Sequence, residues 1–289
     1  MSPIRIYTLI FIAGFTGGSV YPLIKLAEKY NIPNFAYIFW ESLFVVIFLS
    51  LFHLIRRQGK IFQKENINYN VFCALTNILI PQSLFFWIAP HLPTNIISII
   101  IVLTPIFVYA STVLLKHDKF LRTKLYGLII ALIGVLLLFL PNSTEVNNSI
   151  KWFWILATIL VPADYAFNRI IATRLRPENS PSTSLAVGLF AFAGILSGLI
   201  MIVTNSLYIP IELHIGNLAL ICLAFLMSIF YIIFFDLAKL SALHNSLSFY
   251  IAPLVGFSWG IFLFQESLTT ILIISTLLVF SGLYLVNQK

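Results

Sequence analysis

Charge is what this 289-residue sequence has least of. Only 9% of its residues are Asp, Glu, Lys or Arg, 60% are hydrophobic and the mean hydropathy is +0.99. A soluble domain carries about 25% charged residues, so a water-facing surface is excluded. Because apolar runs recur along the whole length, we expect a lipid bilayer as the solvent. The net charge of +7 then indicates basic loops at the cytoplasmic surface rather than a nucleic-acid partner.

Cysteines and recognisable catalytic motifs are also scarce. Cys73 and Cys222 each lie inside an apolar run, which argues against a disulfide framework or a metal site. The sequence has no phosphate loop, HExxH motif, Ser-His-Asp order or EF-hand loop, and its five histidines have no ligand spacing. We therefore expect no cofactor, no metal, no enzymatic activity and no ATP-driven transport by this chain alone.

Long apolar runs are what the sequence does have. A spanning helix needs about 20 mostly apolar residues, and ten segments qualify, although some are short. They cover roughly 5–27, 34–55, 69–89, 94–115, 121–140, 151–173, 181–204, 216–238, 244–264 and 268–287. The first has the basic residue and apolar core of a signal peptide. It lacks a small-residue cleavage site and continues to Ala27, so we interpret it as a span.

The distribution of basic residues predicts an orientation. If the N-terminus is cytoplasmic, every Lys and Arg except Lys25, Lys29 and Lys151 falls on the cytoplasmic side. Cytoplasmic loops of membrane proteins carry this excess. We therefore expect ten transmembrane helices with both termini in the cytoplasm.

The sequence between Thr94 and Phe120 recurs between Ala242 and Leu268. At a constant offset of 148 residues, three pairs coincide: Pro105 with Pro253, Asp118 with Glu266, and Gly134 with Gly282. A repeat of this kind should be identified before other features are interpreted. The first spans match more weakly, but aligning Tyr21 with Tyr165 also aligns Lys25 with Arg169.

This repeat predicts an all-α integral membrane fold built from two halves, residues 1–142 and 143–289. Each half holds five spans, and because five is odd, the second half enters the membrane from the opposite side. Inverted repeats are typical of secondary transporters, which bind substrate between the halves near the bilayer midplane.

The order of these elements resembles the EamA-type members of the drug/metabolite transporter superfamily. Those proteins have two five-helix repeats, each with a proline in the fourth helix, then a charged pair, then a glycine-marked fifth helix. The matching positions here are Lys25, Pro105, Lys116–Asp118, Gly127 and Gly134, followed by Pro253, Glu266 and Gly282. The resemblance covers nearly the whole chain and implies a transporter. Where many members have an arginine early in the second helix, this sequence has Glu41, so no substrate charge preference carries over.

Two embedded carboxyl groups are the first candidates for a site, because a charge at the bilayer centre costs about 2.5–3.5 kcal/mol on insertion scales. Asp164 lies roughly 20 Å deep in the sixth span, and Glu41 lies roughly 10 Å from the outer face in the second. Either one binds a cationic or amine group or a coupling proton, or it is a structural carboxylate held by an ion pair or hydrogen bonds. Asn168 is placed one turn from Asp164, on the same side of the helix.

Several uncharged side chains complete the predicted substrate site. Deep tyrosine and tryptophan side chains each have a polar group that needs a partner, and Gln82 is an embedded donor after Pro81. The predicted set is Asp164, Asn168, Tyr165, Glu41, Gln82, Tyr21, Tyr231, Tyr250 and Trp259. Packing against neighbouring helices is the alternative for any single ring.

Three residues are candidates for gating. Pro105 and Pro253 each remove a backbone donor and should kink equivalent helices. Lys25 lies near the outer end of the first span, where it forms a gate or a carboxylate contact, or instead snorkels or pairs with Glu28 or Glu41. The Gly14–Gly18, Gly194–Gly198 and Gly256–Gly260 pairs permit close helix packing.

These features predict a secondary transporter of small organic metabolites that works by alternating access. Amino acids or amine-bearing compounds are favoured, and the resemblance alone implies export. The alternatives are a lipid-linked carrier flippase, a nucleotide-sugar-type exchanger of the same superfamily, or a non-transporting membrane scaffold. The expected partners are the substrate, the lipid bilayer and, if transport is driven, a coupling proton. We expect a monomer or homodimer in a plasma membrane, by preference the bacterial inner membrane.

Overall fold

The computed structural model describes residues 3–57, 60–114, 121–137, 148–178, 180–212, 214–240 and 242–286. Within these ranges the regular structure is helical and no strand occurs. This is the arrangement that a bilayer imposes, because a helix satisfies its own backbone hydrogen bonds where there is no water. Asp118 and Lys116 lie outside the described residues.

The helices follow the apolar runs of the sequence closely. Residues up to 137 form α1 (Pro3–Gly18), α2 (Val20–Lys29), α3 (Asn34–Ile55), η1 (Lys64–Asn66), α4 (Ile67–Cys73), η2 (Ala74–Leu79), α5 (Ile80–Ile88), α6 (Thr94–Ile101), α7 (Thr104–Leu114) and α8 (Arg122–Leu137). The later residues form α9 (Asn148–Leu175), α10 (Ser182–Val203), α11 (Ile215–Leu240), α12 (Ala242–Phe264) and α13 (Thr270–Val286).

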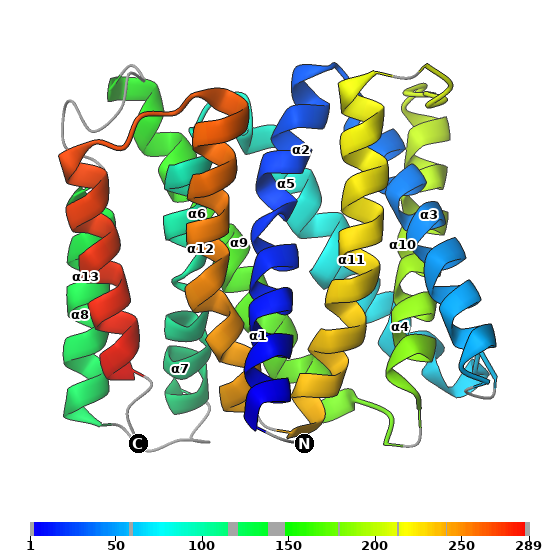
Figure 1. The fold of residues 1–289 in the computed structure, drawn as a ribbon, viewed down its shortest axis with the longest axis horizontal. Helices are drawn as coiled ribbons and strands as arrows, with labels where there is room; N and C mark the ends of the chain where they lie inside the picture. The colour runs from blue at the N-terminus through cyan, green and yellow to red at the C-terminus, as the bar shows by residue number, and fades with distance from the viewer. Residues whose placement is uncertain are drawn as a thin grey trace.

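Six helical segments of the described chain are long and apolar enough to cross a membrane. They are Ile4–Lys29, Asn34–Ile55, Lys64–Ile88, Thr94–Ser111, Ser182–Val203 and Ile215–Leu237, and two shorter apolar helices follow at Ile251–Phe264 and Thr270–Leu285. The helices stand roughly side by side, and α1 begins at the same end of the bundle where α13 ends (Figure 1).

The loops divide between the two ends of the bundle. The connections α3–η1 and α9–α10 lie at the end where α1 begins, whereas α2–α3, α10–α11 and α12–α13 connect at the other end (Figure 1). Most described basic residues therefore gather at the end with the termini, among them Arg56, Arg57, Lys60, Lys64 and Arg176.

Proline shapes the helix interruptions. Pro105 has no N–H to donate to the carbonyl of Ile101, and α6 ends at Ile101. The Thr104 hydroxyl donates to that carbonyl instead, at 2.7 Å, and α7 begins there. The second predicted hinge differs, since α12 continues through Pro253 without interruption.

The principal contacts join early helices to late ones. α8 packs against α13, α3 against α10, α1 against α12, and α7 against α9. Glycines allow the α8–α13 approach: a Cβ on Gly134 would lie 2.9 Å from the Ser275 carbonyl oxygen, and one on Gly282 would lie 2.8 Å from the Ala131 Cβ. Small residues at such contacts let helices approach closely in lipid.

Candidate functional site

A pocket lies between α1, α2, α5, α9, α11 and α12, near the middle of the bundle. Gly17 is close to the midpoint of the Pro3–Lys29 segment, and Met227 is close to the midpoint of α11. The lining residues are Ala13, Gly17, Val20, Tyr21, Asn77, Gln82, Tyr165, Met227, Phe230, Tyr231, Phe234, Ser248 and Ala252. The centres of water molecules can occupy about 60 Å³ of the pocket, which is space for several waters, since one needs about 10–15 Å³.

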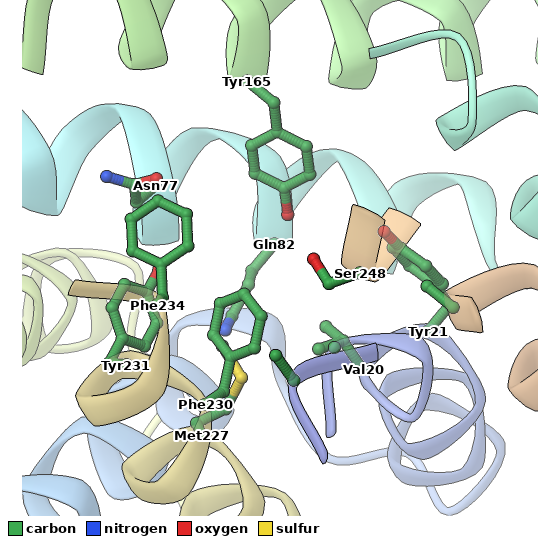
Figure 2. Close-up of a pocket in the computed structure, with 13 residues that line it drawn as sticks. Val20, Tyr21, Asn77, Gln82, Tyr165, Met227, Phe230, Tyr231, Phe234 and Ser248 are labelled. Atoms are coloured by element: carbon green, nitrogen blue, oxygen red, sulfur yellow. The ribbon is translucent and has the colours of Figure 1, made fainter. Parts of the chain in front are cut away.

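The described residues of the pocket wall are aromatic, apolar or polar, and none of them is charged. Figure 2 shows Tyr165 entering from one side with its hydroxyl directed inward, while Phe230, Tyr231 and Phe234 enter from α11. Asn77, Gln82 and Ser248 supply amide and hydroxyl groups. Such a wall binds a partly apolar molecule and orients it through a few hydrogen bonds.

The α11 rings are held by aromatic packing. Tyr231 is 4% exposed, and its ring meets that of Phe190 on α10 edge-on, with the centroids 5.1 Å apart. The Phe230 and Phe234 rings pack together one turn apart, with the centroids 5.6 Å apart. Because these contacts fix the rings, the aromatic side of the pocket is formed before any ligand binds.

Gln82 connects the pocket to a buried carboxylate. Its side-chain Nε2 donates to Glu41 Oε1 on α3 at 3.1 Å, and Glu41 is 0% exposed. Glu41 Oε2 and Gln82 Oε1 are both buried without a hydrogen-bond partner in the described structure. Glu41 therefore lies one hydrogen bond behind the pocket wall.

A π-helical segment positions two of the lining side chains. η2 spans Ala74–Leu79 and precedes Pro81, which has no N–H for the carbonyl of Asn77. Single π turns inside α-helices occur frequently at functional sites. Here the π turn contains Asn77 and comes just before Gln82, and both line the pocket.

The Asp164–Asn168 pair lies close to the pocket but does not line it. Asn168 is 2% exposed, and its Nδ2 donates to the Thr76 hydroxyl of η2, so it joins α9 to the π turn. Asp164 is half-buried, and its Oδ2 is buried without a partner in the described structure. Among the described side chains no Lys or Arg forms an ion pair with it.

Lys25 forms a polar junction at the end of the bundle opposite the termini. Its Nζ lies 3.0 Å from Glu266 Oε1 and donates to the Leu92 carbonyl at 3.1 Å. Glu266 also accepts hydrogen bonds from the backbone N–H groups of Thr94 and Asn95, at 2.7 and 3.0 Å. A carboxylate is favourable at this position because the N-terminus of α6 carries partial positive charge. Of the alternatives for Lys25, the structure has a carboxylate contact, and the ion-pair partner is Glu266.

The remaining predicted residues are placed as follows. Trp259 does not line the pocket; its Nε1 donates to the Ser19 hydroxyl at 2.9 Å, at the break between α1 and α2. Tyr250 lies on α12, and its side chain is outside the described part. Of the predicted substrate-site residues, Tyr21, Tyr165, Tyr231 and Gln82 line the pocket.

Sequence reasoning missed several lining residues. They are Asn77, Met227, Phe230, Phe234 and Ser248. The position of Asn77 four residues before Pro81 is a usable signal, because a proline leaves that carbonyl unpaired. The apolar residues of α11 give no such signal, because this helix has hydrophobic side chains around its whole circumference.

No group of three or more His, Cys, Asp and Glu residues suited to a metal occurs in the described ranges. The two cysteines are unpaired; Cys73 is buried and Cys222 is exposed.

Comparisons with known proteins agree with the fold. No curated protein sequence matches the chain. Among solved structures 28 chains match. One of them, described only as "Crystal structure of protein", has a TM-score of 0.67 and 17% identity and covers 96% of this chain and 95% of its own. At that identity the likeness establishes a shared fold alone. Residues 4–140 match the EamA-like transporter family, whose members are transporters. The first part of this multi-pass membrane protein, residues 4–140, is therefore similar to the EamA-like transporter family, which is part of the drug/metabolite transporter superfamily.

Proposed function

We propose that this protein is a secondary transporter of small organic metabolites that works by alternating access around the central pocket. The observation that carries the proposal is the pocket itself, which lies at mid-depth among helices from both ends of the sequence and whose described lining residues are largely aromatic and carry no charge. Transporter sites near the bilayer midplane occupy this position.

The mechanism requires ten spans arranged as two inverted halves. Two residue pairs that the sequence repeat equates support this arrangement. Tyr21 and Tyr165 both line the pocket, and Gly134 and Gly282 both lie in the α8–α13 contact. The two halves then share one site, and rocking one against the other opens it to either side.

The end of the bundle that holds the termini faces the cytoplasm in this proposal. The basic residues at that end support it, because cytoplasmic loops carry an excess of Lys and Arg. The membrane is a plasma membrane, by preference the bacterial inner membrane.

The substrate is an amine-bearing compound such as an amino acid or an aromatic amine, and the direction is export. Tyr21, Tyr165, Phe230, Tyr231 and Phe234 surround the pocket, and ring faces attract ammonium groups. Asp164 contributes a nearby negative charge without touching the ligand. Among the described lining residues there is no Lys or Arg, which disfavours the phosphate-bearing nucleotide sugars of the alternative function.

The Lys25–Glu266 junction is the outer gate. It joins α2 and the start of α6 to the segment after α12, so separating the halves at this end must break it. The interruption between α6 and α7 at Pro105 provides a bending point nearby, and Pro253 weakens α12 at the equivalent position.

Counterflow in proteoliposomes tests the function. Vesicles preloaded with one unlabelled amine should take up the same labelled amine faster than empty vesicles, across a panel that includes phenylethylamine and amino acids. Tyr165→Leu should weaken phenylethylamine binding about 2- to 30-fold, because a cation–π contact contributes about 0.5–2 kcal/mol. Tyr126→Leu, which changes a tyrosine on α8 that is 60% exposed, is the matched control. Absence of counterflow for every compound would refute the proposal.

A further inference from the structure

We propose that Glu41 is a proton-binding site and that Gln82 transmits its protonation state to the substrate, so that one proton exchanges for one amine. This inference rests on the proposed transport function. It assigns the coupling to Glu41, which is 0% exposed and hydrogen-bonded to the pocket wall, rather than to Asp164, which is half-buried and does not line the pocket.

Within the described part of the chain, the surroundings of Glu41 contain no neutralising cation. α3 packs against α5, α10 and α11, and neither α5 nor α10 contains a titratable residue. α11 brings Cys222 close to Tyr37, which itself lies one turn before Glu41 on α3. Among the other titratable groups on these helices, Tyr231 lines the pocket together with Gln82. His53 lies about 18 Å further along α3, and Asp236 and Lys239 lie more than three turns beyond Cys222 on α11.

A carboxylate in this position lacks a countercharge. A buried charge without an opposite partner is strongly destabilising because it is left uncompensated, and Glu41 has no such partner in the described structure. Oε2 also has no hydrogen-bond donor. A proton on Oε2 removes the charge and turns an unpartnered acceptor into a donor.

Protonation changes what Gln82 presents to the pocket. With ionised Glu41, Nε2 of Gln82 donates to the carboxylate and Oε1 is left without a donor. Oε1 is then an acceptor for a substrate ammonium group. A protonated Glu41 donates its O–H to Gln82 Oε1, the amide turns, and the Nε2 hydrogens face the pocket. These hydrogens repel an ammonium group.

The exchange is balanced in atoms and charge. At the outer face a proton from water binds Glu41 Oε2, and the ammonium substrate leaves the pocket. At the inner face an ammonium substrate enters, the O–H bond of Glu41 breaks, and the proton passes to water. One positive charge moves in each direction, so a tenfold proton gradient supports at most about tenfold accumulation of the amine.

Two measurements on the full-length protein test this inference. The first is the infrared difference spectrum between acidic and alkaline buffer, without substrate. The wild type should gain the carbonyl stretch of a protonated carboxylic acid at low pH. Glu41→Gln should lose that band, and Glu41→Asp should keep it if the amide variant fails to fold. An unchanged band in Glu41→Gln overturns the proposal.

The second measurement is phenylethylamine transport in proteoliposomes. The wild type should accumulate the amine under an imposed pH gradient. Glu41→Gln should lose this accumulation and bind the amine more weakly in counterflow, because a neutral side chain at this position corresponds to the protonated state in which Gln82 repels the ammonium group. Gln82→Leu should keep the infrared band and lose the accumulation, which a purely structural Gln82 would not do. Accumulation retained by Glu41→Gln overturns the coupling. If the wild type shows no counterflow but the infrared band is still present, amine transport through the pocket is refuted, and the coupling is refuted with it. The assignment of Glu41 as a proton-binding site would still hold in that case.

Discussion

The carboxyl groups of Asp164 and Glu41 are both embedded in the bundle but lie in different environments. Glu41 is 0% exposed and accepts a hydrogen bond from Gln82. Asp164 is only half-buried, and one of its oxygens has no partner in the described structure. Both are expensive groups to keep in a membrane, and in neither case does a described basic side chain neutralise the charge.

Asp164→Asn should stabilise the folded protein and impair transport. Removing an uncompensated charge lowers the cost of burial, so we expect the free energy of unfolding to rise by about 1–3 kcal/mol. Thermal unfolding in detergent measures it, and the exposed Glu178→Gln is the control. If substrate affinity, transport rate and pH dependence all stay at wild-type values, the assignment of Asp164 to the site fails.

At the level of helices, proline has different effects at the two equivalent positions Pro105 and Pro253. The sequence predicts a hinge at both Pro105 and Pro253. Of these two positions, the helix is interrupted only before Pro105, where the Thr104 hydroxyl donates a hydrogen bond to the Ile101 carbonyl. Proline removes a hydrogen bond in both places, but whether the helix ends there depends on which neighbouring group replaces that bond. This cannot be read from the proline alone.

Breaking the Lys25–Glu266 junction should open the outer end of the bundle. Lys25→Met removes a charged hydrogen bond that contributes about 1.5–3 kcal/mol, so the gate should open about 10- to 150-fold more often. The opening frequency can be measured with a single cysteine at Thr94, whose native side chain is 0% exposed. In a variant that lacks Cys73 and Cys222, this cysteine should react with a membrane-impermeant maleimide at a rate that rises with opening.

Two comparisons complete this experiment. Lys29→Met changes an exposed lysine one turn further along the chain and should leave labelling unchanged. Lys25→Met combined with Glu266→Gln should label no faster than the faster single variant, because both remove one shared interaction. Independent, additive effects would argue against a common gate.

Gly282→Leu should separate α8 from α13. The new side chain would meet the Ala131 backbone nitrogen at 2.7 Å, and overpacking of this kind costs about 1–3 kcal/mol. Thermal unfolding should shift down accordingly. Ser281→Leu, on the exposed face of the same helix, should have little effect, and equal shifts for the two variants would contradict the close contact.

For the whole molecule, single cysteines test the orientation in the membrane. In a variant lacking Cys73 and Cys222, a cysteine at Ser206 should react with an impermeant reagent in intact cells. One at Lys60 should react only after the cells are permeabilised. The loops that contain these positions lie at opposite ends of the bundle, and the basic end should face the cytoplasm. The reverse pattern would invert the proposed direction of every step.

Sequence reasoning recovered the helical segments much better than the pocket. Apolar runs identify spans because lipid demands them locally, and the helix bounds follow those runs. The partner of Lys25 lies 241 residues away, and its identity depends on how the halves dock. Lining residues such as Met227 and Phe230 are ordinary hydrophobic residues of α11, and which of them face the pocket depends on the rotation of that helix in the assembled bundle.

The π turn at Ala74–Leu79 also determines the direction in which the side chains of the following helix α5 point around the helix axis. A wider turn holds one more residue than an α-helical turn, and each α-helical residue advances the chain by about 100°. Deleting Ile78 would restore ordinary pitch and swing Gln82 by roughly that angle, away from Glu41. The contact between the carboxyl group and the pocket therefore depends on a single inserted residue, whose loss would separate Gln82 from Glu41 although neither residue is itself replaced.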